Sequence, residues 1–167
     1  MNWAHLHLLL NHVPVLGTLF GLALLLYAVL RRNEGLKRVA LGACTLVALM
    51  ALPTYFSGEP AEEVVEHSAG VSEPAIESHE DAALGALAGV EVLGLVALVG
   101  LFLSRGGRAL PANVARAAVL VAILTAGLMA RTANLGGQIR HAEIRADAQP
   151  QQGEEAEEAE GDEDEGQ

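Results

Sequence analysis

The chain has 167 residues, of which 51% are hydrophobic, and its mean hydropathy of +0.34 is too high for an ordinary acidic soluble protein. Its formal net charge is −11, but residues 154–167 hold nine carboxylates and no base, so the rest of the chain carries only −2. Ten Lys and Arg residues, spread thinly, form no basic stripe for phosphates, which argues against nucleic-acid binding.

Four apolar stretches are long enough to cross a hydrocarbon core as helices, which takes about 20 residues. They cover about residues 11–30, 39–56, 82–103 and 112–131. No basic region precedes the first stretch, so we interpret it as a helix rather than a secretory signal. The sequence therefore predicts an all-α fold, a four-helix transmembrane bundle within a membrane domain of residues 1–147. A disordered acidic tail is expected over residues 148–167.

The basic residues predict how this bundle is oriented. Lys and Arg accumulate in short cytoplasmic loops of membrane proteins. Seven of the ten lie between the first and second stretches or around the connection of the third and fourth: Arg31, Arg32, Lys37, Arg38, Arg105, Arg108 and Arg116. We therefore expect a multi-pass protein of a bacterial cytoplasmic (inner) membrane, with both termini outside.

The outer segments also have a readable local structure. Residues 61–67 follow Pro60 and are rich in Glu, which predicts a short outer helix in the connection between the second and third spans. Ser72 is a suitable N-cap for a helix that begins near Glu73 and continues into the third stretch. The last helix should overrun the membrane, because polar residues recur at three- and four-residue steps after Arg131.

With this topology all six histidines fall on the outer side: His5, His7, His12, His67, His79 and His141. Neutral imidazole suits haem iron, copper and zinc, and the end of a helix bundle can hold a cofactor between facing helices. Two imidazoles from different helices would ligate a b-type haem.

We expect His12 and His79 as the first ligand pair, and His5 or His7 with His141 as the second. Arg131 lies at a depth similar to that of His12 and could neutralise a haem propionate. The chain has no Cys-x-x-Cys-His sequence, so a c-type haem is excluded.

Three functions remain open at this point. The first is a haem b protein of membrane electron transfer, with a redox partner on the outer face. The second is a protein that handles or transports copper, zinc or iron through the same histidines. The third is a non-catalytic membrane subunit or scaffold, either a homo-oligomer or part of a larger complex. No nucleophile–base pairing or nucleotide-binding loop is present, so we expect a carrier or binding protein rather than a hydrolase or transferase.

Glu91 lies near the middle of the third stretch, where an ionisable group is costly and marks a functional site by default. Two interpretations compete: a role in proton movement or quinone contact, and a neutral carboxyl that fixes helix packing, with Thr18 and Thr125 at a similar depth. Two pairs of glycines have the spacing that allows close helix packing: Gly17 with Gly21, and Gly85 with Gly89.

Four short segments together resemble a bacterial family: residues 7–16 (HLLLNHVPVL), Ser57-Gly58, residues 79–84 (HEDAAL) and residues 134–141 (NLGGQIRH). It is the domain-of-unknown-function family of four-helix predicted membrane proteins, which has a His-x4-His-x-Pro opening and a Gly-Gly close. Some relatives of this kind are joined to Rieske iron–sulfur domains. The resemblance covers roughly residues 5–145 and implies a place in membrane electron transfer, with haem as the favoured ligand of the histidines.

Overall fold

The chain folds as a set of helices, which the computed structural model describes for residues 2–66, 71–141 and 144. The elements are α1 (Trp3–Leu10), α2 (His12–Leu30), α3 (Glu34–Phe56), α4 (Gly58–Val65), α5 (Glu73–Leu103), the 3-10 turn η1 (Arg105–Gly107) and α6 (Ala112–Arg140). Four helical segments each contain an apolar stretch long enough to cross a membrane: Trp3–Leu30, Glu34–Val65, Glu73–Leu103 and Ala112–Ile139. The expected all-helical chain with four apolar spans is confirmed. The acidic tail (148–167) and His67 lie outside the described residues.

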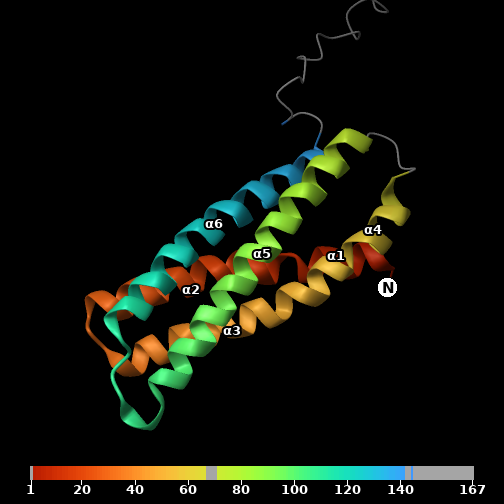
Figure 1. Ribbon diagram of the computed structural model, residues 1–167. Helices are drawn as coiled ribbons and strands as arrows, with labels where there is room; N and C mark the ends of the chain where they lie inside the picture. The colour runs from red at the N-terminus through yellow and green to blue at the C-terminus, as the bar shows by residue number, and fades with distance from the viewer. Residues whose placement is uncertain (1, 67–70, 142–143, 145–167) are drawn as a thin grey trace, which may run out of the picture.

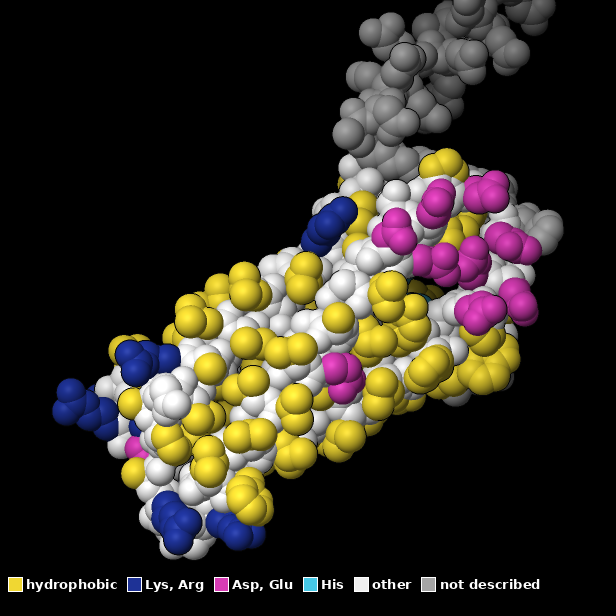
Figure 2. Space-filling model, viewed as in Figure 1, with side chains coloured by type: hydrophobic (Ala, Val, Ile, Leu, Met, Phe, Trp, Pro, Cys, Tyr) yellow, Lys and Arg dark blue, Asp and Glu magenta, His cyan; other side chains and the backbone are white. Residues whose placement is uncertain are grey.

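The long helices form a closed ring, in which α2 and α5 each pack against both α3 and α6. The α2–α3 and α5–α6 connections lie together at one end of the bundle (Figure 1). At the other end, α1 packs mainly against α4, near the start of α5. This arrangement places the basic connections at one end, which we call the basic end, and the Glu-rich segments at the opposite, acidic end (Figure 2).

The helix limits follow local sequence signals. Ser72 is the N-cap residue of α5, whose first turn contains Pro74, as expected. The short helix α4 begins at Gly58 and has Pro60 in its first turn, as the sequence predicts. Helix α6 continues to Arg140, nine residues past the end of its apolar stretch, so the predicted overrun is confirmed.

A proline separates α1 from α2. Pro14 has no backbone N–H, so it cannot donate the helical hydrogen bond to the carbonyl of Leu10. The Thr54 hydroxyl of α3 contacts that carbonyl at 3.3 Å and also donates to the Met50 carbonyl at 2.9 Å. The hydroxyl has one proton, so the Leu10 carbonyl receives the longer branch of a shared hydrogen bond, which links α3 to the end of α1.

Glycine and alanine let the helices approach closely. A Cβ at Gly17 would lie 2.6 Å from Val47, and one at Gly21 would lie 3.0 Å from the Cys44 sulfur, so both face α3 as their spacing predicts. Gly89 likewise contacts α6. The expectation for Gly85 was wrong, because a Cβ there meets nothing within 4 Å.

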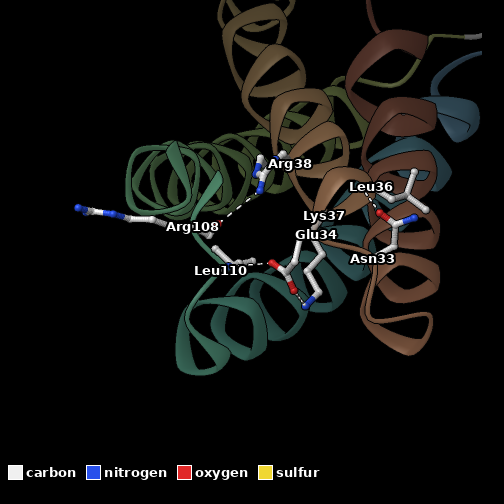
Figure 3. Close-up of polar contacts among 7 residues, drawn as sticks. All are labelled: Asn33, Glu34, Leu36, Lys37, Arg38, Arg108 and Leu110. Carbon is white, nitrogen blue, oxygen red and sulfur yellow. Dashed lines mark hydrogen bonds and ion pairs between the residues drawn. The ribbon is translucent and has the colours of Figure 1, made fainter. Parts of the chain in front are cut away.

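Polar contacts close the basic end (Figure 3). Glu34, in the first turn of α3, accepts a hydrogen bond from Lys37 at 2.6 Å and another from the backbone N–H of Leu110 at 2.8 Å. These two bonds lower the pKa of Glu34, the Lys37 bond having the larger effect. Arg38 also donates to the Arg108 carbonyl at 3.4 Å. Residues 34–38 therefore tie the first pair of helices to the α5–α6 connection.

The packing predicts a contrast between two glycines of α5. A Cβ at Gly94 would collide with Ala48, whereas Gly85 faces open space. We expect Gly94→Val to destabilise the bundle by about 1–3 kcal/mol or more, since neither side can yield. Gly85→Val is the matched control. Unfolding in mixed detergent micelles measures both, and equal stability of the two variants would contradict the observed α3–α5 packing.

Candidate functional site

Two histidines turn into the acidic end of the bundle from different helices. His7, on α1, is half-buried, and its Nδ1 lies 2.9 Å from the Ser57 hydroxyl. Ser57 is itself buried and donates its one hydroxyl proton to the Thr54 carbonyl at 2.7 Å. The Ser57 oxygen must therefore accept a hydrogen bond from the Nδ1–H group of His7. The neutral ring of His7 then has its lone pair on Nε2.

His79, on α5, has the same tautomer for a similar reason. Its Nδ1 lies 3.0 Å from the backbone carbonyl of Thr132 on α6, and a carbonyl can only accept. The ring packs against Gly136, where an added Cβ would lie 3.0 Å from its Cε1 atom. A glycine is therefore needed at residue 136 to make room for the imidazole.

The two imidazoles influence each other electrostatically. Both lie outside the apolar stretches, which begin at residues 11 and 82. Burial lowers the pKa of His7, and the neighbouring His79 lowers it further, while a hydrogen bond to Thr54 has a smaller opposite effect. Burial also lowers the pKa of His79, against hydrogen bonding to Thr132 and the charge of Glu80. Both rings are thus held as neutral imidazoles, the form that binds metals.

The other predicted ligands are more exposed than this pair. His5 is exposed near the start of α1. His12 is exposed in the first turn of α2, and its Nδ1 bonds the Leu8 carbonyl at 2.8 Å. Arg131 is exposed on α6, and His141 is exposed directly after that helix. Of the predicted ligands, only His7 lies close enough to His79 for its pKa to be lowered by that ring, and His12 is exposed.

The sequence reading assigned no role to the residues that hold these rings. Ser57, Thr54 and Thr132 accept or relay the imidazole hydrogen bonds, and Gly136 provides the space beside His79. The signal in the sequence that could have indicated these residues was the resemblance in the segments Ser57-Gly58 and Gly136-Gly137. Those segments lie beside the two histidines, Gly58 being 3.7 Å from the His7 ring when a Cβ is added.

Carboxylates surround this end of the bundle. They come from α4, from Glu66 directly after it, and from the first turns of α5, and Figure 2 shows acidic side chains gathered around a recess: Glu59, Glu62, Glu63, Glu66, Glu73, Glu77, Glu80 and Asp81. Glu62 forms a side-chain hydrogen bond with Glu80. This bond, followed by burial and by repulsion from neighbouring Glu residues, raises the pKa of Glu62 to about 7. Glu62 therefore keeps its proton to a higher pH than an ordinary carboxyl group does.

Away from the histidines, the described residues form a cavity but no group of three metal-ligating side chains. Within residues 2–66, 71–141 and 144, no three His, Cys, Asp or Glu side chains lie close enough to hold a metal ion. A cavity of about 310 Å³ lies between α5 and α6 near the basic end, lined by Leu95, Val96, Val99, Asn113, Val114 and Ala117. It contains no titratable group and is separate from the histidines.

Comparison with known proteins adds no assignment: no protein-family model, curated protein or solved structure matches the chain.

The hydrogen bonds predict one tautomer for both histidines. In ¹⁵N NMR spectra of the imidazoles at pH 8, we expect His7 and His79 to show a protonated Nδ1 and a bare Nε2. Ser57→Ala removes the acceptor for His7 and should mix its tautomers without changing His79. Ser78→Ala is the control, because Ser78 bonds only the Pro74 carbonyl in its own helix. A protonated Nε2 in the unmodified protein would contradict the assignment.

The Glu62–Glu80 pair predicts a pH-dependent stability. The pKa of Glu62 in the folded protein lies above its ordinary 4.5. Its contribution is complete below pH 4.5 and is lost as the pH rises through about 7. We therefore expect the unfolding temperature of wild type to fall more steeply from pH 6 to pH 8 than that of Glu62→Gln. Glu63→Gln, on the exposed side of α4, should keep the wild-type slope, and an unchanged slope in Glu62→Gln would contradict the raised pKa of Glu62.

Proposed function

We propose that this protein binds haem b at the acidic end of the bundle, with His7 and His79 as the axial ligands, and that it carries electrons in a membrane. The observation that supports this most is the pair of half-buried imidazoles on α1 and α5, each with its Nδ1 engaged. A metal-binding histidine usually donates its second ring N–H to a carbonyl or another acceptor, which orients the ring and raises its basicity.

The number of donors favours haem over a bare ion. A tetrahedral zinc site uses three or four protein ligands, and the described residues contain no group of three. Haem iron takes four ligands from its own ring and needs two from the protein. His7 and His79 match that requirement, and the bound group would supply one-electron redox chemistry.

The charge distribution supports an orientation for this function. The basic end holds seven of the ten Lys and Arg residues, so it would face the cytoplasm, and the histidine end would face outward. The setting would be a bacterial cytoplasmic membrane with both termini outside. Carboxylates around the histidines would then attract a cationic redox partner in a salt-dependent way.

A second function has one observation in its favour. The eight carboxylates around the recess concentrate cations, which suits a protein that passes copper, zinc or iron to the same two histidines. In that case the protein is colourless, or only weakly coloured, and carries the metal without porphyrin. A scaffold would carry neither.

A reduced-minus-oxidised visible spectrum separates these functions. For protein purified in detergent from haem-replete cells, we expect Soret and α bands in wild type. His7→Ala and His79→Ala should lower haem occupancy at least about tenfold, because each removes an axial ligand. His5→Ala and His12→Ala, which change exposed rings on α1 and α2, are matched controls and should keep the bands.

A colourless wild-type protein would overturn haem binding, and metal analysis of the same sample would then test the second function. Bands that disappear in His12→Ala but persist in His7→Ala would overturn the ligand assignment while keeping the haem.

A further inference from the structure

One carboxyl oxygen of Glu91 has no hydrogen-bond partner among the residues that the structure describes. Glu91 is the one acidic residue in the four apolar stretches, and Figure 2 shows an acidic side chain isolated within the apolar surface. The side chain of Glu91 is partly exposed, and its Oε1 atom is buried without a hydrogen bond among the described residues. Hydrocarbon offers no hydrogen bonds, so such a group is costly unless another protein surface satisfies it.

Glu91 lies within an outward stripe of α5 whose members are spaced four and three residues apart: Leu84, Ala88, Glu91, Leu95, Leu98 and Phe102. The four large apolar members are 54–62% exposed. The opposite face of α5, with Ala86, Val90 and Ala97, is the one buried in the bundle. This four–three spacing matches the seam of two helices that pack along each other.

Glu91 distinguishes this stripe of α5 from the other helix faces that point away from the bundle. Leucines facing outward are equally well placed in lipid, so the apolar members alone indicate no partner. A carboxyl group in the middle of the stripe gains only from a surface that offers it hydrogen bonds. Ala88, three residues before Glu91, is small enough to let a second backbone come close.

We propose that a second copy of this chain packs along α5, with the two Glu91 carboxyl groups hydrogen-bonded to each other across the interface. A two-fold axis that runs parallel to the two α5 helices, between their stripes, places each residue opposite its own counterpart. Because Oε1 is buried within its own chain, a second copy reaches only the exposed part of the carboxyl group, and there one protonated Glu91 can donate to its counterpart. A single polar residue at a seam position also fixes the register of the two helices.

This interface is separate from the proposed haem site. Glu91 is twelve residues from His79 along α5, or about 18 Å along the helix axis. The proposed dimer can therefore be tested independently of the proposed haem site.

Cysteine cross-linking in lipid vesicles tests the geometry. In a Cys44→Ala background, we expect a membrane-permeable oxidant to link copies that carry Leu84→Cys or Leu95→Cys into disulfide-bonded dimers. Leu124→Cys is the matched control, since Leu124 is 69% exposed on α6 and lies outside the stripe. Cross-linking at Leu124→Cys equal to that on the stripe would overturn the proposal.

Dilution of fluorescently labelled chains in vesicles tests the role of Glu91. We expect energy transfer in wild type to fall as lipid is added, and Glu91→Leu to weaken dimerisation about tenfold, the size of an interhelical hydrogen bond in a membrane. Glu91→Gln should keep most of the affinity, because one amide can likewise donate to the other. A wild type that remains monomeric at every dilution, or a Glu91→Leu variant that dimerises as tightly, would overturn the proposal.

Discussion

The break at Pro14 between α1 and α2 is the constraint on which the histidine end of the bundle depends. The Thr54 hydroxyl, shared between the Leu10 carbonyl and a carbonyl of its own helix, links α3 to that break. Pro14 leaves the Leu10 carbonyl without its helical partner, and a bilayer supplies no water to replace it. Because α3 provides this shared bond, α1 is held beside the end of α3, where Ser57 can accept from His7. One proline thus determines both the break in the first span and the location of a candidate ligand.

The sequence predicted the spans well because hydrophobic length and helix signals are local properties. The apolar runs, the N-cap at Ser72 and the overrun of α6 could all be recognised from neighbouring residues. The pairing of histidines was harder to predict. Depth along a helix follows from residue counting, but the direction of a side chain around the axis depends on packing, so depth alone did not predict that His7 is half-buried and His12 exposed.

The glycines show the same limit. Gly17 and Gly85 each begin a pair with four-residue spacing, yet the first packs against Val47 and the second faces open space. Spacing shows which residues share a face and does not show what that face meets. Gly136 is more indicative of the site than either of these glycines, because a larger side chain at residue 136 would press on the imidazole of His79.

The two hydrogen-bonded histidines also bear on how the chain assembles. His7 is held by residues of α3 and its end, and His79 by a residue of α6, so each ring is oriented within its own helical hairpin. Short connections allow α2–α3 and α5–α6 to enter a membrane as successive hairpins, each stable before the two associate. The two half-buried histidines come to the same end of the bundle only after the halves dock, so loading of the proposed haem would report completed assembly rather than insertion.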